Sequence, residues 1–451
     1  MIIGIDFGTS TTVVRYIEEG YRKPDMIVDS NGNHIIPTVI YKNAAGIFSY
    51  GCEALTALES DKQMGKKGEL FANFKMDLLE PEGSPKRALA EELILQFLSE
   101  HVYKLVSNQV AGVRGGESYD IAISYPAKWT GSMADFMVNA VKMAGFSPRK
   151  VIKMTEPEAA VINMLHNHQR ELIQSSLLKV GKPLHIFTLD MGAGTTDITI
   201  FRFSLKDDGS FVLDNQLPYP PVDNPYLCGG REIDGILFSF VKEHCRKYGV
   251  PLDEEDFDVS VAKRWKDSFC SDKLKMNENV GFPHELLAPL RYIPGGTEAL
   301  RAFYFDRNVY ESITKEHWHN LYNLIKCAIR KYEDIYGIGA EGIDLLTITG
   351  GHSQWYTVLK LFNGEGIAGI GAEDDADGVK FTRLLDDPRR FEKFIDPRMH
   401  ESVANGLCYV DEKIDIHQSS ANNVWVQLVI NDKESEVYKV VSQGRTLPCS
   451  E

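Results

Sequence analysis

Three short runs of β-branched and apolar residues, each ending in a glycine-rich turn, constrain the fold of this chain most strongly. The runs read IIGIDFGTSTT near the N-terminus, HIFTLDMGAGTTDITIF around residue 190 and LLTITGGHSQW around residue 350. Long stretches with apolar residues at a helical period lie between them, including ALAEELILQFLSEHVYKLVSNQV and WHNLYNLIKCAIRKYEDIYG. Strands that alternate with helices predict an α/β architecture.

The first two turns form a loose internal repeat. Each run passes from a strand into an aspartate (Asp6 or Asp190), one further residue, a glycine, and then small and hydroxyl residues. A glycine lets the backbone approach a phosphate, hydroxyl and N–H groups can surround it, and an acid can hold a hydrated cation. An ordinary hairpin turn would fit one such stretch equally well. Two of them predict duplicated lobes that each offer a phosphate-binding turn to a shared cleft.

Length and composition exclude several other classes of protein. A chain of 451 residues predicts two or three packing units. The net charge is −15 and the basic residues are spread along the chain, which argues against a nucleic-acid partner. Seven cysteines without a CxxC pair favour neither a zinc site nor a disulfide framework. With no signal-peptide pattern and no membrane-spanning run, we expect a cytoplasmic protein.

The three turns, in this order, resemble the phosphate-1, phosphate-2 and adenosine motifs of the actin, sugar-kinase and Hsp70 ATPase superfamily. Five further segments are similar to Hsp70 ATPase domains: NFKMDLL, AISYPAKW, VIKMTEPEAAVI, CGGREID and DPRMHESVANGL. The resemblance spans roughly residues 1–415 and is nearest to divergent Hsp70-like proteins with a reduced or rewritten substrate-binding half. It implies a two-lobed actin-like ATPase fold, built from duplicated ribonuclease H-like domains, with the nucleotide in the interlobe cleft.

The same resemblance implies a division of the chain. Lobe I would comprise residues 1–183, with a smaller nucleotide-covering subdomain at about 35–110, and lobe II residues 184–365. Residues 366–418 would form a helix that returns to lobe I. Residues 419–451 alternate like a β-strand pair and resemble the start of an Hsp70 substrate half, but are too few for a peptide-binding sandwich and lid. Either the chain ends at a domain boundary or the protein has no full substrate domain.

The resemblance also implies Mg²⁺ and ATP as ligands. Asp6 and Asp190 would hold Mg²⁺, mostly through its waters. Lys75 would supply the catalytic cation, and Glu156 with Asp190 or Asp197 would orient the attacking water. The nucleotide-binding residues implied in this way are Gly8, Thr9, Ser10, Thr11, Gly192, Ala193, Gly194, Thr195, Gly229, Gly230, Asp272, Lys275, Gly350, Gly351, His352 and Gln354.

Simpler interpretations stand beside these roles. Asp197 could merely brace its turn, and Lys75, taken alone, is typical of a solvated surface lysine. Glu156 suits a helix N-terminus, where an acid complements the macrodipole, and that placement does not exclude catalysis. Three histidines show no ligand spacing and are interpreted as ordinary: His34, His185 and His352.

Three features depart from the Hsp70 pattern. Gln354 stands where Hsp70 has an arginine against the adenine, and the segment at 271–276 keeps an acid and a lysine but loses a second cation. We therefore expect a weaker cation–π contribution to adenine binding. Ala193 replaces a glycine, a mild change unless the turn requires positive φ.

These observations predict an Hsp70-like, Mg-dependent ATPase in which slow hydrolysis and lobe closure act as a chaperone-like conformational switch. Its partners would be ATP and ADP, together with a protein or peptide client. Two alternatives share the superfamily. An actin-like filament-forming ATPase would sediment on addition of ATP, and a small-molecule kinase would need an aspartate base facing a substrate pocket.

Overall fold

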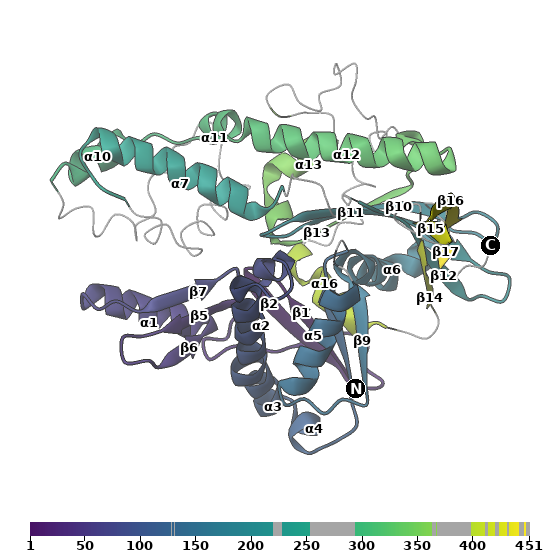
Figure 1. The fold of residues 1–451 in the computed structure, drawn as a ribbon, viewed down its shortest axis with the longest axis horizontal. Helices are drawn as coiled ribbons and strands as arrows, with labels where there is room; N and C mark the ends of the chain where they lie inside the picture. The colour runs from purple at the N-terminus through teal and green to yellow at the C-terminus, as the bar shows by residue number, and fades with distance from the viewer. Residues whose placement is uncertain are drawn as a thin grey trace.

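The computed structural model describes residues 1–127, 129, 131–219, 228–252, 294–362, 367, 398–410, 414–419, 424–430, 433–441 and 446–447. Within these ranges helices alternate with strands, and two six-stranded sheets dominate the fold. The prediction of a mixed α/β protein is therefore confirmed. In Figure 1 the first sheet lies in the lower half of the view and the second in the upper half. No helix in the described ranges has an apolar stretch long enough to span a membrane.

The first sheet has the strand order β3-β2-β1-β8-β9, and β4 also pairs with β2. Strands β1, β8 and β9 run parallel, whereas β2 is antiparallel to β1. A layer of helices covers one face and shares a core with the sheet. The strands are β1 (Ile2–Phe7), β2 (Thr11–Ile17), β3 (Asp25–Met26), β4 (Ile35–Pro37), β8 (Asp120–Tyr125) and β9 (Lys150–Thr155). The helices are α2 (Pro85–Phe97), the π-helical η2 (Leu98–Tyr103), α3 (Lys104–Gln109), α4 (Ala111–Arg114) and α5 (Gly131–Met143).

The second sheet has the order β13-β10-β11-β12-β14-β17 and repeats the central pattern of the first. Strand β10 is antiparallel to β11 and parallel to β13, as β1 is to β2 and β8. The strands are β10 (Leu184–Met191), β11 (Thr196–Leu205), β12 (Phe211–Tyr219), β13 (Leu345–Thr349), β14 (Ile414–Ser419) and β17 (Thr446–Leu447). This repetition is what two similar glycine-turn hairpins predict.

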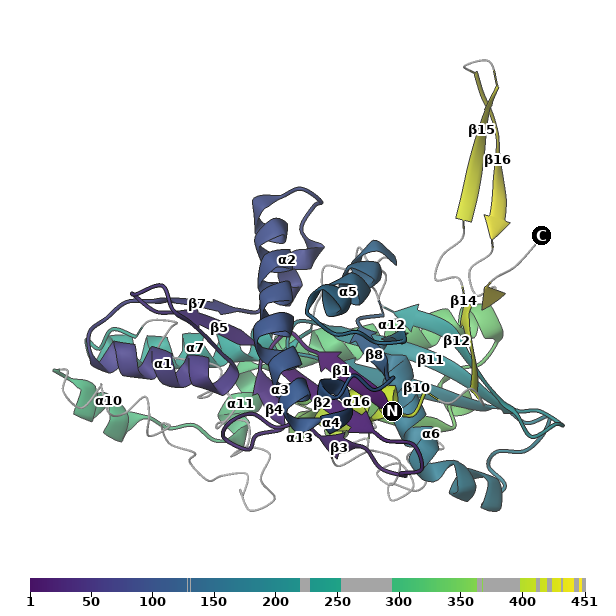
Figure 2. The same cartoon turned by 90° about the horizontal axis from the view of Figure 1, so that it is seen from below.

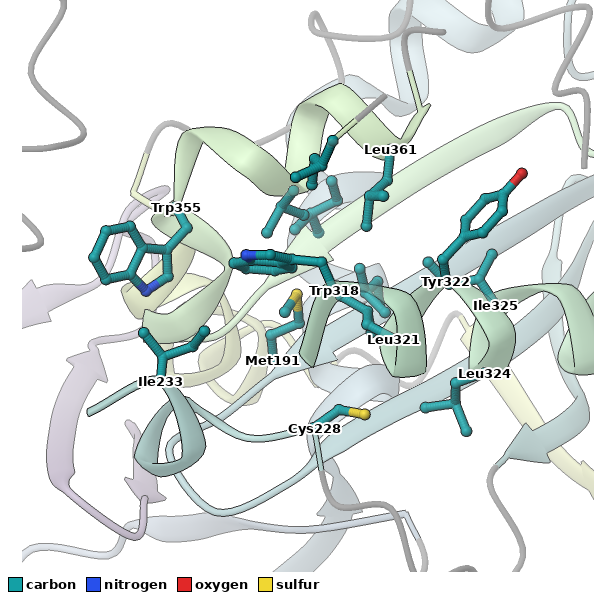
Figure 3. Packing of buried hydrophobic residues seen from close by; sticks show 14 of the residues in the cluster. Met191, Cys228, Ile233, Trp318, Leu321, Tyr322, Leu324, Ile325, Trp355 and Leu361 are labelled. Atoms are coloured by element: carbon teal, nitrogen blue, oxygen red, sulfur yellow. The ribbon is translucent and has the colours of Figure 1, made fainter. Parts of the chain in front are cut away.

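Helices cover one face of the second sheet. Figure 3 shows Trp318 of α12 packed near Met191 at the end of β10 and Leu361 of α13. Helix α12 buries Trp318, Leu321 and Ile325 at a helical spacing, and it ends at Gly337 in the left-handed conformation, as the sequence predicts. The helices on this side are α7 (Gly230–Lys247), α10 (Gly296–Ala302), α11 (Arg307–Ile313), α12 (Lys315–Tyr336), η4 (Ala340–Gly342), η5 (Gly351–Gln354) and α13 (Tyr356–Phe362).

Two helices lie between the sheets, α6 (Glu156–Gln174) and α16 (Ser402–Cys408), the latter preceded by η6 (Met399–Glu401). Their apolar residues form a core that includes residues of both sheets. A side chain at Gly406 would overlap the backbone of Ala159 on α6, and one at Gly4 of β1 would meet the Ala404 carbonyl. Close packing of glycines thus fixes α16 against β1 and α6.

A small three-stranded sheet with the order β6-β5-β7 carries α1 on one side. It extends to the left of the first sheet in Figure 1. The short helix that holds Lys75 follows directly after β7. The elements are β5 (Val39–Lys42), β6 (Phe48–Tyr50), α1 (Gly51–Gln63), β7 (Glu69–Ala72) and the 3₁₀ helix η1 (Phe74–Leu79).

The C-terminal strands differ from the predicted boundary at residue 419. Strand β14 begins at Ile414 and pairs in parallel with β12, so the end of the predicted returning-helix segment is instead a strand of the second sheet. Strand β17 pairs with β14. Strands β15 (Val424–Ile430) and β16 (Lys433–Val441) form the expected β-strand pair, which projects away from the rest of the chain in Figure 2.

Candidate functional site

The two glycine-turn hairpins have the same hydrogen-bond pattern. The N–H of Gly8 donates to the carbonyl of Thr11 over 3.0 Å, and the N–H of Gly192 donates to that of Thr195 over 2.9 Å. Asp6, two residues before Gly8, pairs with Val13 on β2. Asp190, two residues before Gly192, pairs in the same way with Asp197 on β11. Asp6 and Asp190 therefore occupy the same place in the two hairpins.

Both hairpins line one cavity of about 630 Å³, a size that suits a small-molecule ligand. The cavity brings together most of the predicted site. The predicted residues that line it are Asp6, Gly8, Thr9, Ser10, Thr11, Lys75, Glu156, Asp190, Gly192, Ala193, Gly194, Thr195, Gly230, Gly350, Gly351, His352 and Gln354.

Among the predicted residues that the structure describes, two are not part of this lining. Gly229 lies behind it, against the backbone of the second hairpin. Asp197 is buried on β11, directly opposite Asp190 on β10. Asp272 and Lys275, the predicted adenine contacts, lie outside the described residues.

Asp6 lies near the end of β1 and is hydrogen-bonded by a neighbouring strand. The Ser124 hydroxyl of β8 donates to Asp6 Oδ1 over 2.8 Å. Burial, together with the negative charge of Glu156, raises the pKa of Asp6 to about 7, although Lys75 and the Ser124 hydrogen bond act in the opposite direction. Lys75 and Ser124 therefore do not fully offset the effects of burial and of Glu156 on the Asp6 carboxylate.

Asp190 is likewise a buried carboxyl with other acids close to it. Burial raises its pKa well above the ordinary value, and the charges of Glu156, Asp197 and Asp6 raise it further. Its buried Oδ2 atom has no hydrogen-bond partner among the described residues. A buried carboxylate oxygen without a partner, within a group of acids, fits a divalent cation with oxygen ligands.

Lys75 is a buried lysine, only 2% exposed, so it is not a solvated surface residue. Its Nζ donates to Glu156 Oε1 over 2.8 Å and lies 5.2 Å from the centre of the Trp129 ring. Asn73, in the left-handed conformation with φ 60°, turns the chain from β7 into η1 and so directs Lys75 toward the cavity.

Glu156 is the first residue of α6, so the helix-terminus interpretation is correct. The cap itself is made by its neighbours: Glu158 N donates to the Thr155 hydroxyl, and Thr155 N donates to the Glu158 carboxylate. Because these residues satisfy the helix end, the Glu156 carboxylate is left to contact Lys75 in the cavity.

The third turn follows β13. Gly350 has φ 87°, and any side chain there would overlap the Met191 carbonyl, so this position requires glycine. Gln354 Nε2 lies 2.6 Å from His400 Nδ1 in η6. His352 is buried, and its Nε2 lies 3.2 Å from His317 Nε2. His352 thus lines the cavity and also belongs to a buried histidine pair.

The alanine in the second turn is compatible with its backbone. In the described part of the chain, the non-glycine residues with positive φ are Asn73, Ser176 and Cys228. Ala193 is not among them, so its replacement of glycine introduces no backbone strain there.

Several lining residues were not predicted as site residues, although all lie within the quoted segments. Trp129 is the last residue of AISYPAKW, and Met76 follows Lys75 in NFKMDLL. Sequence reasoning missed them because the resemblance assigns roles only to residues that match the motifs. The additional lining residues from these segments include Asn73, Met76, Leu79, Trp129, Arg231, Glu232, Asp234, Met399, His400 and Val403.

A cavity with paired acids, a buried lysine and two glycine turns has the composition of a phosphate- and cation-binding site. No model of a known protein family matches the chain. Chaperone protein DnaK of Thermotoga petrophila and of Thermotoga maritima are each 22% identical over 365 residues, which cover 78% of this chain and 53% of DnaK. DnaK of Thermosipho melanesiensis is 23% identical over 363 residues.

The chain spans about half the length of the curated relatives it matches. This distant similarity to DnaK, an Hsp70 protein, supports placement near the Hsp70-like ATPases.

Proposed function

We propose that this chain is an Hsp70-like ATPase that binds ATP in the cavity between the hairpins and slowly hydrolyses it to ADP and phosphate. The observation that carries the proposal is the pair of hairpins with one hydrogen-bond pattern, each presenting an aspartate to the same cavity. The similarity to DnaK supports it independently.

Mg²⁺ is the metal that the site residues fit. Among the described residues the Oδ2 of Asp190 has no hydrogen-bond partner, and burial together with the charge of Glu156 raises the pKa of Asp6. A divalent cation would stabilise both buried carboxylates. Asp6 and Asp190 would hold the ion mostly through its waters. When bound, Mg²⁺ neutralises charge on the phosphates.

The hairpins hold the phosphates in this proposal. The N–H and hydroxyl groups of residues 9–11 and 192–195 donate hydrogen bonds to phosphate oxygens from opposite sides. Lys75 stabilises the charge that develops on the transferred phosphoryl group. Glu156 orients the attacking water and accepts its proton. Asp197, opposite Asp190 on β11, adds negative charge that favours a bound cation.

The output of the proposed reaction is a conformational change. A nucleotide held by both hairpins would join the two sheets in a closed, two-lobed actin-like arrangement, and loss of the γ-phosphate would weaken that connection. A chaperone-like switch acting on a protein or peptide client follows by analogy with DnaK.

A phosphate-release assay on the purified chain tests this proposal. We expect slow release of phosphate from ATP in the presence of Mg²⁺ and none in the presence of a chelator. Absence of both ATP binding and phosphate release would overturn the proposal. Sedimentation in Mg-ATP distinguishes the filament alternative, because we expect no ATP-dependent pelleting.

A further inference from the structure

A second cluster of metal-ligand side chains lies beside the cavity, away from Asp6 and Asp190. His34, His400 and Glu401 each offer one ligand atom, and these atoms all lie within 4.8 Å of one another. We propose that these three residues bind a divalent transition-metal ion of the Zn²⁺ class, distinct from the proposed Mg²⁺.

The distances between the ligand atoms are close to those that a tetrahedral ion requires. Bonds of 2.0–2.2 Å to nitrogen and oxygen place neighbouring ligand atoms roughly 3.3 Å apart. Glu401 Oε1 lies 2.7 Å from His34 Nε2 and 3.7 Å from His400 Nε2. Small side-chain rotations would bring both distances to the required value.

Glu401 is held so that one oxygen faces the histidines. The residue is only 2% exposed, and its Oε2 lies 2.6 Å from Arg15 Nη2 on β2 and 3.3 Å from Arg398 Nη1. The guanidinium groups fix the carboxylate and leave Oε1 toward the imidazoles. Their positive charge also disfavours a cation, so we expect moderate rather than very tight affinity.

Gln354 supports His400 from the opposite side of its ring. A metal-binding histidine commonly donates its other ring N–H to a second group, which fixes its orientation. Gln354 lies 2.6 Å from His400 Nδ1, and an amide rotated by 180° would present its oxygen to that N–H. His400 Nε2, which lies 3.7 Å from Glu401 Oε1, would then be the nitrogen that binds the metal.

The ligand set determines the class of ion. Two imidazoles and one carboxylate suit Zn²⁺ or Co²⁺ better than Mg²⁺, which prefers oxygen ligands. The His34 and His400 side chains are 32% and 21% exposed, so water can complete the coordination. A bound ion would connect the segment before β4 to η6, which also contacts the third glycine turn through Gln354.

Titration of the nucleotide-free full chain with Co²⁺ tests the site, because visible absorption reports the coordination of this ion. We expect one equivalent of tetrahedral Co²⁺ in the unmodified chain and its displacement by Zn²⁺. The intense band should be lost in His34→Ala and in Glu401→Gln. A matched control is His319→Ala, which removes an exposed histidine on α12 and should bind as the parent does.

His34→Ala decides the outcome if Glu401→Gln fails to fold, because His34 is partly exposed and circular dichroism can establish that its variant is native. A parent chain without the tetrahedral band, or a folded His34→Ala variant with unchanged stoichiometry and affinity, would overturn the proposal. Since no nucleotide is present, failure of this site is distinguishable from failure of the proposed ATPase.

Discussion

Lys75 Nζ lies 2.8 Å from Glu156 Oε1, although the two residues are 81 positions apart in the chain. Lys75 comes from η1 after the small sheet, and Glu156 is the first residue of α6. Ordering a lysine side chain in a buried position costs conformational entropy and desolvation. The pair is therefore a specific feature of the cavity, and it provides the first test of the proposed chemistry.

Replacing either member of this pair should reduce catalysis much more than binding. Lys75→Ala and Glu156→Ala should each lower ATP turnover by about 10²-fold, because both groups act on the phosphoryl group and the water. Nucleotide affinity should change far less. Single-turnover phosphate release and isothermal titration measure the two effects. Lys153→Ala, which removes an exposed lysine paired with Asp135, is the control and should retain the parent rate.

Base selectivity should be weak in the parent chain. An arginine stacked on adenine contributes about 0.5–2 kcal/mol. With glutamine at position 354, the preference for ATP over GTP should therefore be lower by up to roughly thirtyfold. Gln354→Arg should tighten ATP binding more than GTP binding, after breaking the contact with His400. Competition titrations on both proteins measure this selectivity. A parent that strongly excludes GTP would mean that another side chain recognises the base.

Gly194 and Met76 form a contact between the second hairpin and η1. A side chain at Gly194 would overlap the Met76 thioether, so Gly194→Ala should displace the helix that carries Lys75. We expect roughly 1 kcal/mol of strain, equivalent to about fivefold weaker nucleotide binding. The double variant with Met76→Ala should recover most of the loss, because the smaller side chain makes room. Equal affinity of Gly194→Ala and the parent would contradict this steric account.

Gly406→Val should destabilise the fold itself. The new side chain would enter the backbone of Ala159 on α6 and force α16 away from its site, at a cost of about 2–3 kcal/mol. Denaturant unfolding followed by circular dichroism measures the change. The control is Gly131→Ala at the start of α5, where a side chain meets no atom within 4 Å and should be nearly neutral.

The hairpins and the end of α12 were predictable because local sequence determines them. An aspartate, a glycine and hydroxyl residues between two β-branched runs specify a tight turn, and Gly337 supplies the left-handed cap that ends α12. The burial of Lys75, by contrast, is not determined by the local sequence. It results from packing between distant elements, so only the resemblance to Hsp70 pointed to this lysine.

The remaining differences also arise from tertiary packing. His34 was interpreted as ordinary because nothing near it in the sequence has ligand spacing; His400 and Glu401 reach it only in the folded chain. Strand β14 was assigned to the returning-helix segment because a short strand that pairs with the distant strand β12 leaves no local sequence signal. The other predicted domain boundaries and the assignments of Asp272 and Lys275 remain predictions.

The central claim is that Asp190 helps to hold Mg²⁺ at the phosphates of ATP. Titration of Mg-ATP into the parent chain and into the Asp190→Asn variant tests this claim most directly. Asparagine keeps the shape but removes a buried charge whose Oδ2 lacks a partner in the described structure. Without ligand, the variant should therefore be more stable at pH 8, by about 1–3 kcal/mol. Its Mg-ATP binding or hydrolysis should nevertheless fall well below that of the parent. Parent-like Mg-ATP binding and phosphate release in a folded Asp190→Asn variant would contradict the account.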